Sequence, residues 1–211
     1  MDLFNITKRL IDIVGSIFGI ILFSPILLVG AIWVKIVSPR GLVFANPPPR
    51  VGKNKVPFKL LKFRSMIPNA HDWMKSQPEL WKKYLENDYK LDPDPRLLPG
   101  AKILRKFSID EIPQFINILK GEMSLVGPRA YYFFEVENQL KKHPKSKRYI
   151  EEALGVKPGL TGPWQVGGRS EIGFADRVKM DAQYAKRHSI LYDLLIILKT
   201  PLAVLMAKGA Y

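Results

Sequence analysis

Cysteine is absent from this chain of 211 residues, and histidine is scarce. Without cysteine the chain can form neither a disulfide framework nor a thiolate metal site, and its composition is compatible with a reducing compartment. The three histidines, at positions 71, 143 and 188, lack metal-ligand spacing, so we do not expect a zinc site. The sequence also has no Gly-x-Gly-x-x-Gly fingerprint and no Walker loop, so neither a dinucleotide fold nor a nucleoside triphosphatase is indicated.

Acidic residues are few relative to basic ones. The chain has 33 Lys and Arg against 19 Asp and Glu, which gives a formal net charge of +14. This balance predicts anionic partners, namely nucleic acid, an anionic membrane face or phosphorylated small molecules, and composition alone leaves the choice open. The apolar fraction of 47% is enough for a packed core in one domain or two small ones.

One apolar run is long enough to cross a bilayer. No charged residue occurs from Ile13 to Val34, whereas Lys8 and Arg9 precede the run and Lys35 and Arg40 follow it. The run begins too late and is too long for an ordinary signal peptide. The sequence therefore predicts an amino-terminal membrane segment with basic residues at both ends.

The pair Ser24-Pro25 predicts a break within this run, because proline lacks a backbone donor and disfavours helical geometry at the residue before it. Both flanks are basic, and residues 35–75 hold nine Lys and Arg but a single acid, Asp72. Such charge collects in cytoplasmic loops beside membrane segments. We therefore favour a re-entrant hairpin of helix, break and helix over residues 1–37, with a single kinked span as the alternative.

The rest of the chain predicts an α+β fold that is mostly helical with a small β element. Short strands are expected near residues 42–45 and 58–66, the second with Lys62 and Arg64 on one side. Helices are expected over residues 69–91, 99–105 and 171–187. The apolar segment 190–206 carries Asp193, Lys199 and Pro201, so it suits an interfacial amphipathic helix better than a span. Residues 38–211 would thus form one cytoplasmic, membrane-associated domain.

The segment from Arg105 to Arg129 is the most informative part of the sequence. Ser108 followed by Glu111 fits a capping box, and a start at Asp110 would instead place Pro113 in the first turn of a helix that ends near Gly121. In both cases two adjacent carboxylates would lie at a helix amino terminus. Taken alone, this pattern is usually only a cap.

The neighbouring cations favour a chemical role for the two carboxylates. Arg105 and Lys106 precede them, Arg129 follows a Gly-Pro turn, and the basic strand lies upstream. A helix dipole and nearby cations would keep Asp110 ionised, as a nucleophile must be. Glu111 would hold a magnesium ion or take a proton from an incoming acceptor. Phosphoryl chemistry is therefore the leading hypothesis.

Two further segments are weaker signals. Residues 92–96, Asp-Pro-Asp-Pro-Arg, are typical of a turn. The loop over residues 157–169 contains four glycines, an aromatic residue, Gln165 and a terminal Arg169, so it is able to wrap a nucleotide. A purely structural loop explains this segment equally well.

Together these segments resemble the monotopic phosphoglycosyl transferases, the bacterial sugar transferase family that begins glycoconjugate assembly on a polyprenyl phosphate, in their minimal catalytic form. The resemblance covers nearly the whole chain and is carried by ordered motifs: Lys8 to Asp12, Ser24-Pro25, Lys62 to Met66, Asp94 to Arg96, Leu104 to Lys106, Asp110 to Gln114, Gly127 to Arg129, Lys157 to Gly162, Gly168-Arg169 and Asp193.

The resemblance implies transfer of a sugar 1-phosphate from a nucleoside diphosphate sugar, usually a UDP-sugar, to undecaprenyl phosphate. It implies Asp110 as nucleophile, forming a phosphosugar-aspartyl intermediate, with Glu111 assisting and both carboxylates near Mg²⁺. It implies the following binding residues: Lys62, Arg64, Arg105 and Arg129 for phosphate, and Gln165 and Arg169 for the nucleotide.

The resemblance also implies a location at the cytoplasmic face of the bacterial inner membrane, with membrane lipid, a nucleotide sugar and a polyprenyl phosphate as partners. It implies no nucleic-acid partner, and a homodimer is possible. The competing hypothesis is a membrane-anchored basic adaptor that binds anionic lipid or nucleic acid without chemistry. That hypothesis predicts that Asp110→Asn has no measurable effect.

Overall fold

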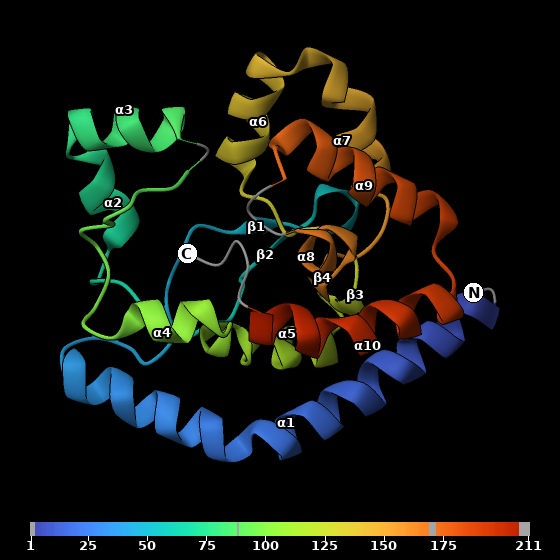
Figure 1. Ribbon diagram of the computed structural model, residues 1–211, viewed down its shortest axis with the longest axis horizontal. Coiled ribbons are helices and arrows are strands. Elements are labelled where there is room, and N and C mark those ends of the chain that lie inside the picture. Colours follow the sequence, from blue (N-terminus) through green and yellow to red (C-terminus); the bar gives the residue numbers. More distant parts are fainter. Residues whose placement is uncertain (1–2, 88, 169–171, 207–211) are drawn as a thin grey trace.

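The computed structural model describes residues 3–87, 89–168 and 172–206 and shows a mostly helical protein with two small sheets (Figure 1). The α-helices are α1 (Leu3–Val37), α2 (Ala70–Lys75), α3 (Pro78–Glu86), α4 (Ala101–Lys106), α5 (Gln114–Lys120), α6 (Phe133–Lys142), α7 (Lys147–Ala153), α8 (Pro163–Gly167), α9 (Phe174–Arg187) and α10 (Ile190–Met206). The strands and 3₁₀ turns are β1 (Arg50–Val51), β2 (Pro57–Phe58), β3 (Ser124–Val126), β4 (Gly159–Thr161), η1 (Lys53–Lys55), η2 (Ile109–Glu111) and η3 (Pro144–Ser146).

Helix α1 forms one edge of the molecule and bends near its middle, with α4, α5 and α10 above it (Figure 1). Pro25 lies inside the helix, and the Ser24 hydroxyl donates to the carbonyl of Ile21 at 2.8 Å. The predicted break is therefore a bend through which the chain stays helical. By length and composition α1 could cross a membrane.

The inner face of α1 carries small residues where other elements come close. A Cβ on Gly19 would lie 2.6 Å from the ring of Phe115, and one on Gly30 would lie 2.8 Å from Phe63. Glycine at these positions lets α5 and the segment after β2 pack directly on the helix. The opposite face of α1 is apolar and exposed, at Val14, Ile17, Phe18, Ile21, Leu22, Leu28, Val29 and Ile32.

Polar contacts fix the first arm of α1, which is the part of the helix before Pro25, to the rest of the protein. The Arg9 guanidinium donates to the carbonyls of Ile118 and Leu119, at 2.6 and 2.7 Å, and so satisfies the carboxyl end of α5. The buried Asp12 carboxylate accepts hydrogen bonds from the Ser124 hydroxyl, at 2.9 Å, and the Leu125 backbone, at 2.8 Å. These hydrogen bonds hold α1 against β3.

Strands are shorter than the sequence predicts. The segments 42–45 and 58–66 do lie side by side, but only through an isolated bridge between Phe44 and Phe63, and β2 ends at Phe58. β1 pairs antiparallel with β2, while β3 pairs parallel with β4, with Ser124 opposite Gly159. The three consecutive prolines before Arg50 supply no backbone donors, which limits a longer ladder there.

Each predicted helical segment is helical in the structure, but the ends of the helices often differ from the prediction. The segment 69–91 forms two helices, α2 and α3, because Pro78 begins a new helix instead of continuing the first. The predicted helices near 99–105, 171–187 and 190–206 correspond to α4, α9 and α10. Helices α6, α7 and α8 were not predicted.

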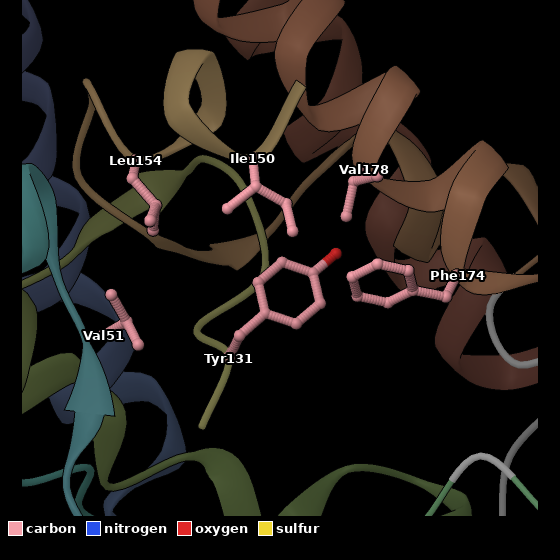
Figure 2. Packing of buried hydrophobic residues seen from close by; sticks show 6 residues of the cluster. All are labelled: Val51, Tyr131, Ile150, Leu154, Phe174 and Val178. Atoms are coloured by element: carbon pink, nitrogen blue, oxygen red, sulfur yellow. The ribbon is translucent and has the colours of Figure 1, made fainter. Parts of the chain in front are cut away.

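Buried apolar residues from four segments form one core cluster, as Figure 2 shows. The Tyr131 ring lies at the centre, and its hydroxyl points toward α9 (Figure 2). The members of this cluster are Val51, Tyr131, Ile150, Leu154, Phe174 and Val178. A second cluster ties the core to α1 and consists of Phe58, Leu60, Phe115, Ile118 and Met123, with Ile20 and Phe23 of α1 packed against it.

Candidate active site

The two adjacent carboxylates lie on η2, one turn before α5. Ser108 has a left-handed backbone, φ 55°, and makes no side-chain capping hydrogen bond, while Pro113 occupies the position before α5. Both sequence predictions of the helix start are therefore wrong: α5 begins at Gln114. The chain uses residues 109–111 for a tight turn that directs Asp110 inward, and the Phe63 backbone N–H fixes that turn by donating to the Asp110 carbonyl at 2.9 Å.

Asp110 is buried beside the ammonium group of Lys62. Asp110 is 3% exposed, and Lys62 Nζ lies 3.6 Å from Asp110 Oδ2. A buried carboxylate needs a compensating charge, which Lys62 supplies. At 3.6 Å, however, the Lys62 ammonium group does not form a close hydrogen bond with the Asp110 oxygen. Lys62 is thereby placed where the phosphate-binding hypothesis requires a cation.

Glu111 is the second carboxyl of the site. Burial and the adjacent Asp110 raise the pKa of Glu111, although Lys62, Arg129 and Arg50 oppose this rise. A carboxyl with a raised pKa holds a proton more readily and is suited to proton transfer.

Arg129 reaches the site from the loop after β3. Its backbone N–H donates to Asp181 Oδ2 at 3.1 Å, and its guanidinium lies 5.1 Å over the ring of Trp164. Burial lowers the pKa of Arg129, but Glu135, Tyr131 and Glu111 outweigh burial and raise it overall. Arg129 therefore stays charged next to Glu111.

Arg50 is a site residue that sequence reasoning missed. It is buried, donates to the Ala130 carbonyl at 2.9 Å and lies 3.3 Å over the ring of Tyr132, while its charge acts on Glu111. Glu135, which acts on Arg129, was missed as well. Neither residue belongs to a short motif, because both reach the site only through the packing of β1 and α6.

Other predicted binding residues are not brought to the two carboxylates by any described contact. Arg64 donates to the carbonyls of Ser38 and Arg40, both at 2.7 Å, and so holds the loop after α1. Arg105 lies near Asp94: burial raises the pKa of Asp94, but Arg96 and, more weakly, Arg105 lower it overall.

The nucleotide-binding predictions fall partly outside the described residues. Gln165 is half-buried on α8 and follows Trp164, which is the residue under Arg129. Its Oε1 lies 2.8 Å from where a Cβ on Gly162 would be. Arg169 lies outside the described residues. The roles of Arg64, Arg105, Gln165 and Arg169 stay predictions.

The residues present suit a magnesium ion. Among the residues that the structure describes, no group of three or more His, Cys, Asp or Glu could hold a metal. Mg²⁺, however, is commonly bound by one or two carboxylates together with water and substrate phosphates. Asp110 and Glu111 supply hard oxygen ligands of that kind.

A buried carboxyl on α9 makes stability depend on pH. Burial raises the pKa of Asp181 to about 7, against hydrogen bonds from the Arg129 backbone and the Tyr131 hydroxyl, and against the charge of Arg177. Because the folded-state pKa is raised, Asp181 contributes stability below pH about 4 that is lost as pH rises through about 7. Asn at this position mimics the protonated form.

We therefore predict that Asp181→Asn gains stability relative to the unaltered protein as pH rises. Its thermal midpoint should be higher by several degrees at pH 8 and nearly equal at pH 4.5, measured by unfolding of both proteins across this range. Asp176→Asn, an exposed carboxyl on the same helix, is the control and should show no such trend. A constant difference across the range would contradict the raised pKa.

The chain matches the family described as bacterial sugar transferases over residues 3–207. The exopolysaccharide production protein ExoY of Sinorhizobium fredii is 38% identical over 211 residues, which cover 98% of this chain and 89% of that protein. The undecaprenyl-phosphate galactose phosphotransferase of Salmonella typhimurium is 37% identical over 208 residues, covering 97% of this chain but 41% of the relative. The UDP-glucose:undecaprenyl-phosphate glucose-1-phosphate transferase of Escherichia coli is 33% identical over 223 residues, which cover 98% of this chain and 42% of that protein.

Proposed function

Because the chain belongs to the bacterial sugar transferase family and is a sugar phosphotransferase, we propose that it transfers a sugar 1-phosphate from a UDP-sugar to undecaprenyl phosphate. This reaction would be the first membrane step of exopolysaccharide or capsule assembly. The observation that carries the proposal is the buried Asp110 carboxylate, with Lys62 3.6 Å away and Glu111 next in the chain. The names of the relatives in Salmonella typhimurium and Escherichia coli support both the acceptor and the sugar phosphate.

In the first step, an Asp110 carboxylate oxygen attacks the phosphorus that carries the sugar. A bond forms between that oxygen and phosphorus, and the bond from phosphorus to the bridging oxygen breaks, so the bridging oxygen leaves on UMP. Lys62 and Arg129 offset the negative charge of the diphosphate as the bond breaks. The product is a phosphosugar bound to Asp110 through an acyl phosphate.

In the second step, a phosphate oxygen of the lipid acceptor attacks the same phosphorus. The acyl phosphate bond to Asp110 breaks, the carboxylate is restored, and the lipid leaves as a diphosphate bearing the sugar. Glu111, whose pKa is raised, accepts a proton from an acceptor phosphate that arrives protonated. A covalent relay suits these substrates, because two dense anions never need to lie in the site together.

Magnesium is part of the proposal. Asp110 and Glu111 would hold the ion, and when bound it would neutralise charge on the diphosphate. The surrounding cations Arg50, Lys62 and Arg129 bind and orient the phosphates from the protein side.

We propose that α1 is re-entrant and that α10 lies in the interface, on the cytoplasmic face of the inner membrane. Exposed apolar side chains cover the outward face of α1, and α10 exposes Leu191, Leu194, Leu195, Leu198, Leu202 and Leu205. Burial of such surface in lipid is favourable, and the charges at both ends of α1 would stay in the headgroups. The active site would then lie near the plane of the acceptor phosphate.

Single cysteines test this topology cleanly, because the chain has none of its own. Leu3→Cys and Arg40→Cys lie at the two ends of α1, and both should react with an impermeant thiol reagent from the same side of sealed vesicles. Lys145→Cys, at an exposed position of η3, reports the side of the membrane on which residues 38–211 lie. Labelling of positions 3 and 40 from opposite sides would establish a full span and exclude the hairpin.

The substrate proposal is tested with a panel of nucleotide sugars and undecaprenyl phosphate. Purified protein with Mg²⁺ should release nucleoside monophosphate from one or a few UDP-sugars and form a lipid diphosphate sugar. Removal of Mg²⁺ with a chelator should lower release by at least about tenfold, because a bound metal ion would stabilise the charge of the transition state by several kcal/mol. Absence of product from every donor would contradict the proposal.

A further inference from the structure

Lys157 is a half-buried cation with no role in the site described above. It precedes β4, and hydrogen bonds hold the backbone of the two residues after it: the Ser124 N–H donates to the Pro158 carbonyl and the Gly159 N–H to the Pro128 carbonyl, both at 2.9 Å. Among the residues that the structure describes, no acceptor lies within hydrogen-bond distance of its ammonium group. Because Lys157 is half-buried and most of the charges that act on it are positive, an anionic ligand that supplies an acceptor would be favourable there.

A second cation borders the same space. Gly121, with φ +83°, ends α5 and has no side chain; the place where its Cβ would lie is 3.5 Å from Lys157 Nζ and 3.7 Å from Arg9 Nη2. Arg9 gives one N–H each to two carbonyls of α5 and keeps further N–H groups available. The Lys157 ammonium group and the Arg9 guanidinium group thus lie close together beside Gly121.

The charges around Lys157 are mostly positive. Burial, followed by Arg9, Lys53 and Lys8, lowers its pKa, and Asp12 opposes them. The Asp12 Oδ1 already accepts two hydrogen bonds from β3. A bound anion would relieve the repulsion between these cations.

The place of this pair in the chain indicates where the anion comes from. Arg9 lies just before the uncharged run Ile13 to Val34, at the level where a helix inserted in a bilayer meets the phosphate groups of lipids. Among the described residues, the charged groups that act on Lys157 are Arg9, Asp12, Lys53 and Lys8, and none of them belongs to the active site.

We propose that Lys157 and Arg9 form a second phosphate-binding site beside Gly121, filled by the headgroup of an anionic membrane lipid or by free phosphate. The bound phosphate accepts from the Lys157 ammonium and from the unused Arg9 N–H groups. It fixes the first arm of α1 against the loop before β4, independently of catalysis.

The test is thermal unfolding of the full chain in an uncharged detergent, titrated with short-chain phosphatidylglycerol, phosphatidylcholine of equal chain length, or inorganic phosphate. Phosphatidylglycerol should raise the midpoint saturably. Lys157→Met should weaken the apparent Kd at least about tenfold, as expected for loss of one charged hydrogen bond, while Lys157→Arg should stay within about threefold. Lys141→Met, an exposed cation on α6, is the control and should bind as the unaltered protein does.

The thermal stability of ligand-free Lys157→Met distinguishes an anion-binding role of Lys157 from a purely structural one. Because the Lys157 ammonium is repelled by its neighbours, Lys157→Met should unfold at the same or a higher temperature than the unaltered protein when no anion is present. A lower midpoint, equal binding by Lys157→Met, or an equal response to phosphatidylcholine would overturn the proposal. A response to inorganic phosphate at least as large as that to phosphatidylglycerol would support the site and assign it to a soluble anion.

Discussion

Asp110→Asn should lower the rate of sugar phosphate transfer by at least about 10³-fold, because it removes the attacking oxygen, and loss of a nucleophile is among the most damaging changes to an enzyme. Asparagine is nearly the same size and fits the same buried position, 3% exposed. The fold should therefore survive. The measurement is the initial rate of nucleoside monophosphate release with saturating donor and acceptor.

The control for this prediction is Asp72→Asn, an exposed carboxyl on α2 that should retain full activity. Thermal unfolding of both variants confirms that they are folded. An Asp110→Asn enzyme within tenfold of the unaltered rate would mean that this oxygen does not attack phosphorus. If neither the unaltered protein nor Asp110→Asn shows turnover, the basic-adaptor hypothesis is favoured instead.

Gly159→Ala should cause the largest loss of stability. A Cβ at this position would lie 2.0 Å from the Gly127 nitrogen and 2.4 Å from the Thr161 carbonyl oxygen, and both are backbone atoms that cannot rotate away. Overpacking costs about 1–3 kcal/mol and more where backbone must move, so the thermal midpoint should fall by about 6 °C or more. Transfer activity should fall too, because Gly127 leads directly into the Arg129 loop.

Gly173→Ala is the matched control for this prediction. Nothing lies within 4 Å of a Cβ there, and φ is −64°, which any residue adopts. Its midpoint should change by less than about 2 °C, in keeping with a surface substitution. A Gly159→Ala protein as stable as this control would show that β3 and β4 are not packed backbone to backbone.

Periodicity and charge predict the parts of this protein that depend on neighbouring residues in the chain. The apolar run with Pro25 indicated α1 and its bend, and the apolar segment with Asp193 indicated α10. The cations at Lys62 and Arg129 were expected beside Asp110 and Glu111, and the structure brings these four residues together.

What sequence reasoning missed depends on contacts between distant segments. Arg50 and Asp181 reach the Arg129 loop from β1 and α9, and no local pattern connects them with it. The capping prediction at Ser108 failed for a related reason: the turn is held by the Phe63 backbone, from a segment far earlier in the chain. The alternation put Arg64 on the same side as Lys62, and in the structure its guanidinium donates to the carbonyls of Ser38 and Arg40. The phosphate-binding role that the resemblance implies for Arg64 stays a prediction.

The most direct measurement is the mass of the intact protein after incubation with the UDP-sugar and Mg²⁺ in the absence of lipid acceptor. The account predicts a gain equal to one sugar phosphate, located on the peptide containing Asp110, with one equivalent of UMP released, and loss of that gain when undecaprenyl phosphate is added. Donor that is consumed only when acceptor is present, with the protein mass unchanged throughout, would contradict the covalent relay.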